Sequence, residues 1–403
     1  MQNVFNTLER RGYVEQLTHP EEIKKLFEKE CVPFYIGIDP TADSLHVGHF
    51  ISLMVASHMQ KAGHKPIILM GGGTAIIGDP SGKTDMRKML TVEDIDNNVA
   101  QIKKQIEKFL SFEGPNAAII VNNGDWLRDL NYINFMREIG VHFSVNRMLA
   151  AECYKNRLET GLTFFELGYM LMQSYDFLYL HDHYGCKLEM GGNDQWSNII
   201  GGVELIRKIG AEDAYGFTFK LLTTKEGKKM GKTEKGALWL NPEKTSPYEF
   251  YQYWRNVADD DIENVMKLLT FIDVDEIEEM TKYKDERINE AKRKAAFEIT
   301  KLVHGEEAAI KAEEATKAMF EGKGNVEAME STKVDVGCTI TEAIVNTGIA
   351  PSKGQAKTLI SQGAISLNEI KIDDISYTLK EEDFKDGYAI LKKGKKIYHK
   401  LVK

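Results

Sequence analysis

Residues 34–49 read FYIGIDPTADSLHVGH, and this stretch indicates the fold of the surrounding chain. Its apolar opening is typical of a buried strand, and HVGH begins a segment with the apolar spacing of a helix. About 180 residues later, the run KMGKT (229–233) lies in a loop rich in glycine and lysine. Between the two runs, strand-like segments alternate with amphipathic helical ones. This alternation predicts a Rossmann-like, doubly wound parallel sheet with helices on both faces.

The apolar patterns give approximate bounds for these elements. We expect strands at 34–38, 66–70, 117–121, 187–190 and 217–222, and helices at 47–62, 92–111, 133–138, 164–180 and 194–209. From Pro247 onward the spacing is helical, in 248–271 and again in 288–320. The predicted organisation is an α/β domain (1–222), the lysine-rich loop and its connection (223–246), an all-helical domain (247–320), a linker (321–332) and a small α/β domain (333–403).

Composition limits the class of protein. Hydrophobic residues make up 42% of the 403 residues, which is enough for a sizeable core. No run approaches the roughly 20 apolar residues of a membrane span, and the start of the chain is polar, so we expect a cytoplasmic protein with no membrane partner. The four cysteines form no CxxC pair, which argues against a zinc site or a disulfide framework. The net charge of −9 means that any nucleic-acid contact must be local.

The side chains of the two runs suggest a phosphate site. His46 and His49 are three residues apart at a predicted helix start, where both imidazoles can donate to the phosphate oxygens of one ligand. Lys229 and Lys232 are point charges on flexible stems, and Thr233 adds a hydroxyl. Taken alone, HxxH is more typical of structural or zinc-binding histidines, and a short basic loop is more typical of a solvated turn. The combination of the two runs favours a site in which both bind the phosphates of one nucleotide.

A glycine-rich crossover at 71–84 follows the second predicted strand. Its ending GKT is similar to that of a phosphate-binding P-loop, but the spacing GxxxxGKT requires glycine where the chain has Ile77. A GxGxxG pattern breaks in the same way at Ile76. What remains is backbone that a ligand can approach closely, with Asp79 beside it.

Several longer runs together resemble the bacterial tyrosyl-tRNA synthetases, a family of class I aminoacyl-tRNA synthetases. HVGH and KMGKT correspond to the class signatures HIGH and KMSKS. The resemblance covers essentially the whole chain and includes FYIGIDPTADSLHVGH, MGGGTAIIGDPSGK, YMLMQSYDF, GGNDQWSN, KMGKT and KTSPYEFYQYW. It implies an enzyme that activates tyrosine with ATP, releases pyrophosphate, and transfers the tyrosyl group to the 3′ end of tRNA(Tyr). Mg²⁺ would accompany the ATP, and residues 1–222 would form the catalytic domain.

The resemblance also implies roles for individual residues. Those for tyrosine are Tyr35 and Asp176 at the phenol, Asp79, Tyr169 and Gln173 at the amino group, and Gln195 near the carboxyl group. Those for ATP are Gly37, Asp39, Thr41, His46, His49, Gly191, Gly192, Asp194 and Lys232. Catalysis would use His46, His49, Lys229, Lys232 and Thr233, with Lys83 and Arg87 on a flap. The spacing agrees for tyrosine, since Tyr169, Gln173 and Asp176 fall on one helix face.

The chain departs from the family pattern at two positions of this predicted site. Gly231 replaces the first serine of KMSKS, which removes a hydroxyl and is expected to loosen the loop. Glu189 stands where the family leads us to expect glutamine, so that a possible carboxylate replaces an amide donor. We expect activity to survive both changes.

The C-terminal segment carries a second signal. The runs APSKGQAK (350–357) and GAISLN (363–368) resemble the small RNA-binding domain first recognised in a ribosomal small-subunit protein, and residues 331–403 hold 12 Lys against 9 Asp and Glu. The alternative is a solvated, lysine-bearing helix. The predicted tRNA contacts are Arg207 and Lys208 at the acceptor stem, then Lys353, Lys357, Lys392, Lys393, Lys395 and Lys396. The helical domain would help to hold the anticodon arm.

Other functions stay open at this point. A tryptophanyl-type synthetase would share the fold and both signatures, although Tyr35 and Asp176 argue against it. A simple HxGH nucleotidyltransferase would leave the lysine loop and the tail without a purpose. A retired synthetase scaffold that only binds RNA would have lost its phosphate-contacting residues, all of which are present. The family resemblance further predicts a homodimer, in which one tRNA would bridge the two subunits.

Overall fold

The computed structural model divides into two compact units, Met1–Ala312 and Glu313–Lys403. None of the described helices combines the length and the apolar character that a membrane crossing requires. The residues that the structure describes are 3–81, 90–210, 213–233, 236–320, 329, 331–368, 370–384, 387–394 and 397–403.

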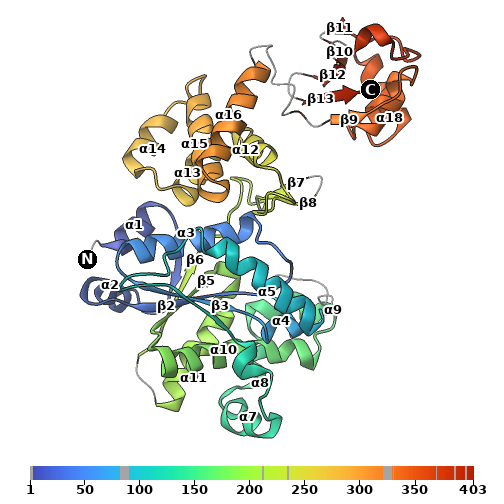
Figure 1. Ribbon diagram of the computed structural model, residues 1–403. Helices are drawn as coiled ribbons and strands as arrows, with labels where there is room; N and C mark the ends of the chain where they lie inside the picture. The colour runs from blue at the N-terminus through green and yellow to red at the C-terminus, as the bar shows by residue number, and fades with distance from the viewer. Residues whose placement is uncertain are drawn as a thin grey trace. The chain divides into compact units, whose positions relative to one another are not determined.

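A six-stranded sheet with the order β1–β6–β5–β2–β3–β4 is the centre of the first unit (Figure 1). Five of its strands are parallel, as predicted, whereas β1 pairs antiparallel with β6 at one edge. The strands are β1 (Val14–Leu17), β2 (Pro33–Ile38), β3 (Lys65–Met70), β4 (Ile119–Asn122), β5 (Leu188–Gly192) and β6 (Tyr215–Phe219). The prediction missed β1 because its sequence, VEQL, is half polar and fully buried at none of its four positions.

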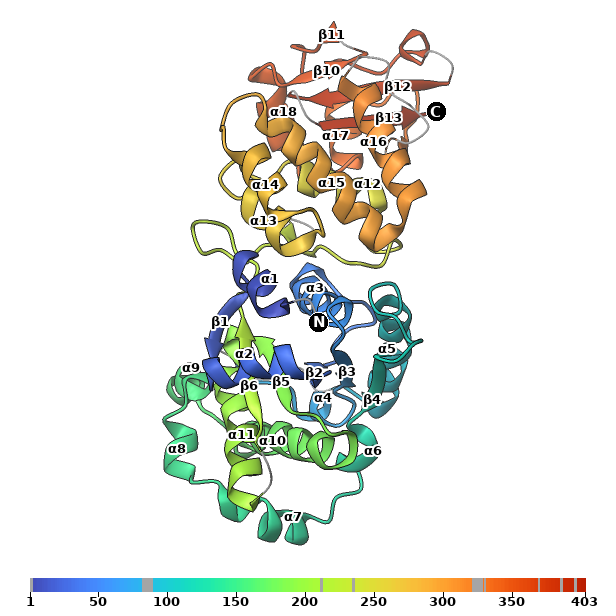
Figure 2. The same ribbon diagram turned by 90° about the vertical axis from the view of Figure 1, so that its left-hand side faces the viewer.

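Both faces of the sheet are covered, which explains its nearly continuous apolar strands. Phe34, Ile36 and Ile38 of β2 pack in one core with α3 (Val47–Lys61). Tyr35 points to the opposite face and packs with α10 (Phe164–Tyr184) and α11 (Trp196–Ile209). Figure 2 shows α3 on one side of the sheet and α10 and α11 on the other. The helices that complete the α/β part are α1 (Val4–Arg10), α2 (Pro20–Lys29), α4 (Thr74–Ile77), α5 (Val92–Ile106), α6 (Gly124–Leu127), α7 (Tyr132–Glu138), α8 (Val145–Leu149), α9 (Glu152–Thr160), α10 (Phe164–Tyr184) and α11 (Trp196–Ile209).

The segment after Pro247 is helical, but both of its predicted long helices are interrupted. The second one breaks at Gly305, which has a φ of +91° that only glycine adopts without strain. Trp254, Ile262 and Leu268 belong to the same hydrophobic core as α3, so this part packs directly on the α/β part. The helices are α12 (Pro247–Arg255), α13 (Ile262–Leu269), α14 (Val274–Thr281), α15 (Ile288–His304) and α16 (Glu306–Phe320).

The second unit is a small α/β fold, as predicted. Its sheet has the order β11–β10–β12–β13–β9, and α17 and α18 pack on it around a core that includes Ile344, Ile360 and Leu391. The elements are β9 (Ser331–Lys333), α17 (Ile340–Asn346), α18 (Lys353–Ser361), β10 (Ile365–Leu367), β11 (Ile370–Lys371), β12 (Tyr388–Lys393) and β13 (Ile397–Val402).

Candidate active site

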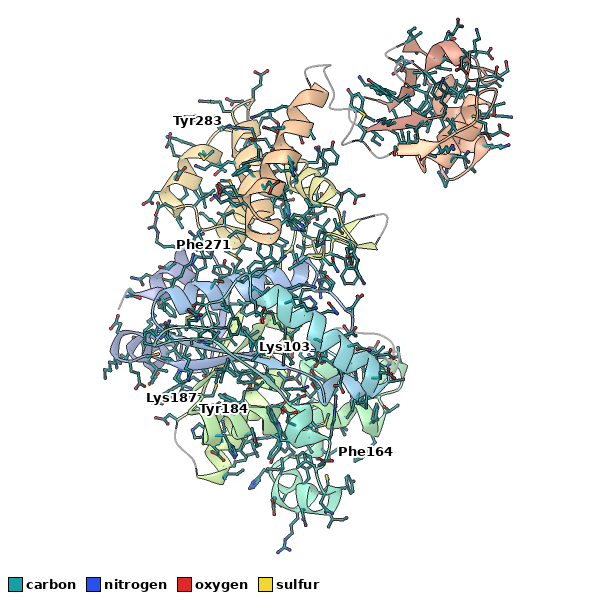
Figure 3. The ribbon with its side chains drawn as sticks, viewed as in Figure 1. Lys103, Phe164, Tyr184, Lys187, Phe271 and Tyr283 are labelled. Carbon is teal, nitrogen blue, oxygen red and sulfur yellow. The ribbon has the colours of Figure 1, made fainter. Side chains whose placement is uncertain are left out.

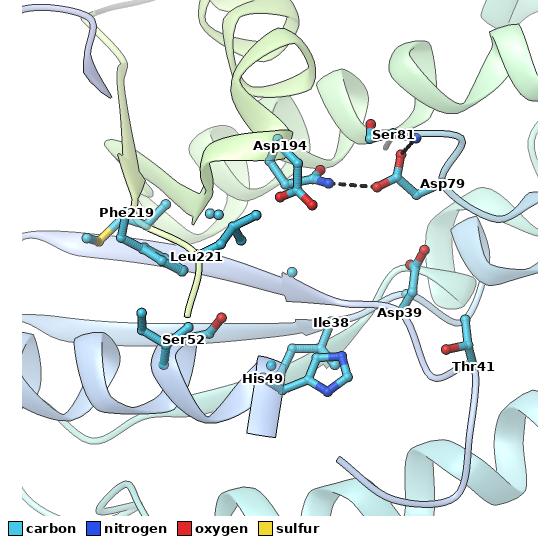
Figure 4. A pocket seen from close by; sticks show the side chains of 18 of the residues that line it. Ile38, Asp39, Thr41, His49, Ser52, Asp79, Ser81, Asp194, Phe219 and Leu221 are labelled. Atoms are coloured by element: carbon cyan, nitrogen blue, oxygen red, sulfur yellow. Dashed lines mark hydrogen bonds between the residues drawn. The ribbon is translucent and has the colours of Figure 1, made fainter. Parts of the chain in front are cut away.

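The site lies where the order of the sheet reverses. The chain leaves β2 toward β3 and β4, and it later adds β5 and β6 on the other side of β2. In open α/β sheets, ligands bind outside the carboxyl ends of the strands at such a switch point. A cavity of about 390 Å³ occupies this position (Figure 4). The end of β2 contributes Gly37, Asp39 and Thr41 to the cavity, and the end of β5 contributes Gly191, Gly192 and Asp194.

The cavity brings together the predicted substrate residues of distant segments. Every residue that the sequence assigns to tyrosine or ATP lines it, and Lys229 lines it as well. Lys83 and Arg87 lie outside the described residues, as does the side chain of Thr233. The assigned lining residues are Tyr35, Gly37, Asp39, Thr41, His46, His49, Asp79, Tyr169, Gln173, Asp176, Gly191, Gly192, Asp194, Gln195, Lys229 and Lys232.

HVGH forms the N-terminus of α3, where backbone hydrogen bonds fix the orientation of both histidine rings. His46 is the N-cap, and its Nδ1 accepts a hydrogen bond from the Gly48 N–H at 3.0 Å, while His49 Nδ1 accepts from the His46 N–H at 3.3 Å. The ring centroids are 4.1 Å apart. Because Nδ1 is the acceptor in each case, a neutral ring carries its proton on Nε2. Both imidazoles are therefore held as donors at a positive helix end, an arrangement suited to an anion.

The chain just after the KMGKT segment is hydrogen-bonded to the chain at HVGH. The Val47 N–H donates to Leu238 O at 3.0 Å, and the Leu240 N–H donates to Leu45 O at 2.9 Å, so the chain that follows KMGKT runs beside the helix start. Lys229 Nζ lies 4.0 Å from a carboxylate oxygen of Asp194, across the cavity mouth. The Lys229 side chain is 60% exposed, which leaves the ammonium group mobile enough to follow a ligand.

Asp176 closes the opposite, buried end of the cavity. Its two oxygens accept hydrogen bonds from Asn123 Nδ2 at 2.8 Å and from Trp126 Nε1 at 2.7 Å. Burial raises the pKa of Asp176, and these two donors oppose the rise. The prediction contained neither Asn123 nor Trp126. The one available signal was the position of Asn123 two residues after a predicted parallel strand.

Acidic and amide side chains pair around the middle of the cavity. Gln195 Nε2 donates to Asp79 at 2.6 Å, a bond visible in Figure 4, and Tyr169 Oη donates to Asp39 at 3.0 Å. Asp194 faces the same space. Three carboxylates around one small volume are suited to bind a ligand ammonium group and ribose hydroxyls.

Three buried polar atoms beside Asp176 have no hydrogen-bond partner within the described structure. They are Tyr35 Oη, Gln173 Oε1 and Glu189 Oε2. Buried polar atoms in native proteins are nearly always paired, because an unpaired one costs about 1–3 kcal/mol. This end of the cavity is therefore built for a ligand that has polar atoms of its own.

The two predicted acceptor-stem residues lie at the exposed end of α11, outside the cavity lining. Arg207 pairs with Glu204 at 2.7 Å, and Lys208 Nζ donates to His142 O at 2.7 Å. Hydrogen bonding to Glu204 raises the pKa of Arg207, which is charged at any relevant pH.

The predicted tail contacts lie on α18 and β12 of the second unit. Lys353 and Lys357 are exposed one turn apart on α18, and Lys353 pairs with Glu342 at 2.8 Å. Lys392 lies over the ring of Tyr398, and Lys393 Nζ donates to Ile349 O at 3.1 Å. Lys395 and Lys396 lie outside the described residues.

Comparison with known proteins identifies the family. The model of "tRNA synthetases class I (W and Y)" matches residues 28–321, and that of the "Tyrosine--tRNA ligase SYY-like C-terminal domain" matches residues 320–401. A tyrosine–tRNA ligase of Clostridium perfringens is 59% identical over the full length of both chains. One of Acetivibrio thermocellus is 57% identical over 100% of this chain and 99% of its own.

A solved structure extends the comparison to the fold. The crystal structure of a C-terminally truncated Aspergillus nidulans mitochondrial tyrosyl-tRNA synthetase matches with a TM-score of 0.72 at 27% identity, covering 79% of this chain and 95% of that one. Both comparisons agree with the two signature runs at the mouth of one cavity. The chain belongs to the class I aminoacyl-tRNA synthetases and, within them, to the tyrosine–tRNA ligases.

Proposed function

We propose that this cavity activates tyrosine. The tyrosine carboxylate attacks the α-phosphorus of ATP, tyrosyl-adenylate forms and pyrophosphate leaves; the terminal ribose of tRNA(Tyr) then takes the tyrosyl group. The observation that carries the proposal is the polarity of one cavity. Unpaired buried acceptors and one unpaired hydroxyl lie at one end, and two histidines and two lysines lie at the other. Such a cavity can place an amino acid and a triphosphate end to end.

The buried end selects the amino acid. Asp176 accepts a hydrogen bond from the substrate phenol, and Tyr35 Oη completes the contact. Asp79, Tyr169 and Gln173 face the substrate amino group. Phenylalanine lacks the hydroxyl, so its binding would leave Asp176 and Tyr35 without their partner in a dry site, which is the physical basis of discrimination.

The phosphate end supplies position and charge, and no side chain forms a covalent bond to the substrate. His46 and His49 donate from Nε2 to phosphate oxygens as negative charge moves toward the leaving pyrophosphate. Lys229 and Lys232 follow that charge on their flexible stems. Asp194, which lies 4.0 Å from Lys229, would accept from the ribose hydroxyls.

We further propose that Mg²⁺ enters with the ATP. The described residues contain no group of three or more His, Cys, Asp or Glu side chains that could hold a metal ion. Mg²⁺ keeps several waters and binds readily to substrate phosphates, so the phosphates and water would supply most of its ligands. Its chemistry here is to neutralise phosphate charge.

We also propose a cytoplasmic homodimer whose C-terminal unit binds tRNA. Large apolar side chains between residues 132 and 165 are strongly exposed, and Phe164 is one of them (Figure 3). Such side chains mark interaction surfaces, and a two-fold interface is the most common solution. The most exposed of them are Tyr132 (60% exposed), Ile133 (69%), Val141 (70%), Val145 (55%) and Phe164 (70%).

Exchange of labelled pyrophosphate into ATP, measured with each amino acid in turn, tests the proposed activity. Tyrosine should support exchange, and phenylalanine and tryptophan should not. Exchange with tryptophan would instead indicate a tryptophanyl-type synthetase. RNA binding without any exchange would favour a retired synthetase scaffold that only binds RNA.

A further inference from the structure

Glu189 lines the buried end of the cavity, beside Tyr35 and Gln173. It is the register partner of Tyr35 on the neighbouring parallel strand, and each side chain is 1% exposed. Gln173 Nε2 donates to Glu189 Oε1 at 2.9 Å. Tyr35 Oη and Glu189 Oε2 lie close enough to perturb each other's pKa, yet neither atom has an aligned hydrogen-bond partner. One rotation of a hydroxyl or carboxyl group would join them.

Two buried carboxyl groups therefore share this end of the cavity, and their surroundings differ. Both oxygens of Asp176 accept from neutral donors, whereas Glu189 receives one such bond, from Gln173. Hydrogen bonds to a carboxylate stabilise its charge, which favours the charge on Asp176 and the proton on Glu189. A charge on Glu189 would raise the pKa of Asp176, so the site disfavours ionisation of both groups together. The ionisable groups that face Glu189 are Tyr35, Asp176 and Cys186. Burial raises the pKa of Glu189 to about 7, and the nearby Gln173 amide and Tyr35 hydroxyl oppose the rise.

We propose that Glu189 is a positioning residue that acts as a neutral carboxylic acid. Its Oε2–H donates to Tyr35 Oη, which turns the Tyr35 hydroxyl proton toward the phenolic oxygen of bound tyrosine; the phenol then donates to Asp176. Each hydroxyl in this chain is both donor and acceptor. The inference rests on the proposed function, because it needs a tyrosine phenol between Tyr35 and Asp176.

Ionisation of Glu189 reverses the chain. The carboxylate would accept the Tyr35 proton, so Tyr35 could no longer donate to the ligand, and two negative charges would stand at one dry end of the cavity. A glutamine at this position would supply an N–H donor at every pH. Glutamate therefore adds a pH dependence of tyrosine binding that an amide lacks.

Equilibrium dialysis of labelled tyrosine against the full-length protein, without ATP, tests this at pH 6 and pH 8. We expect the dissociation constant of the unaltered protein to rise about tenfold, because binding must return a proton to Glu189. The dissociation constant of Glu189→Gln should lie within twofold of that of the unaltered protein at pH 6, and it should change less than twofold up to pH 8. Glu278→Gln, an exposed change on α14 outside the cavity lining, should keep the tenfold rise. Tyr35→Phe should bind tyrosine more weakly and lose the rise.

Two other results would overturn the inference, and they separate it from the proposed function. Equal pH dependence in the unaltered protein and in Glu189→Gln, with tyrosine still preferred to phenylalanine, would refute the role of Glu189 alone. Absence of any preference for tyrosine over phenylalanine in the unaltered protein would refute the proposed function, and the role of Glu189 with it. Measuring KM and kcat for tyrosine in pyrophosphate exchange should place the pH effect in KM.

Discussion

Gly231 and Val47 bring the two signature segments into contact. A Cβ built on Gly231 would lie 2.9 Å from Val47 Cβ, and the Gly231 N–H donates to Tyr253 Oη at 2.8 Å. The φ of Gly231 is +82°, a left-handed conformation that favours glycine. The sequence alone suggests that this glycine loosens the loop. Its conformation and its contact with Val47 show a second reason, which is that no larger residue fits where KMGKT meets HVGH.

Gly231→Ser, which restores the common family residue, should therefore impair this chain. Serine would be strained by about 1–2 kcal/mol at this φ and would press on Val47, so we expect the rate of pyrophosphate exchange to fall about tenfold. Gly227→Ser is the matched control, because Gly227 has a φ of +81° in the same loop, but a Cβ added there would meet no atom within 4 Å. A rate equal to that of the unaltered protein would show that the contact does not matter.

Asp176→Asn should damage the choice of amino acid. Loss of a hydrogen bond to a buried charge costs about 2–3 kcal/mol, which lowers the preference for tyrosine over phenylalanine about 100-fold. The KM for ATP should change less than twofold. Asp182→Asn, on the exposed side of the same helix, should leave both quantities unchanged. An effect confined to ATP would contradict the assignment of Asp176 to the phenol.

His58 makes the fold sensitive to acid. Burial, together with Arg11 and Lys61, lowers its pKa from 6.5 to about 3, so the native ring stays neutral while the unfolded ring takes up a proton. The contribution of the neutral ring to the free energy of unfolding is complete above pH 6.5 and is lost as the pH falls toward 3. At pH 5 the loss is about 2 kcal/mol. The free energy of unfolding of His58→Leu, relative to that of the unaltered protein, should therefore rise by about 2 kcal/mol as the pH falls from 7.5 to 5. Urea unfolding at the two pH values measures this difference. A constant difference between the two proteins would refute this.

The parallel strands were predictable because burial on both faces leaves apolar runs such as 66–70, PIILM. The tyrosine helix was predictable from its spacing and its family motif. The partners of Asp176 were not, since Asn123 and Trp126 lie about 50 residues away along the chain and meet it only after folding. Periodicity also could not show the break at Gly305, because one glycine within a helical pattern is compatible with either outcome.

Removal of all residues after Gly324 should separate the two steps of the reaction. The α/β part and the helices that share its core remain, so tyrosine-dependent pyrophosphate exchange should stay within twofold of the full-length rate. Charging of tRNA(Tyr) should fall at least 100-fold, because the lysines of α18 and β12 are lost. Equal loss of both activities would show that the C-terminal unit is needed for activation itself.

Ile133→Asp should weaken the proposed dimer. Burial of a carboxylate in an apolar interface costs desolvation free energy, and a two-fold dimer buries two such groups. The dissociation constant measured by sedimentation should therefore rise at least 100-fold. Ile370→Asp is the control, since Ile370 is comparably exposed, at 71%, in the C-terminal unit. An unaltered protein that sediments only as a monomer at micromolar concentration would contradict the dimer.

A crystal structure with a non-hydrolysable tyrosyl-adenylate analogue tests the central claim most directly. We predict that the phenolic oxygen lies within hydrogen-bond distance of both Tyr35 Oη and an Asp176 carboxylate oxygen, with the phosphate beside His46 and His49. An analogue bound in the reverse direction, or in another cavity, would contradict the account.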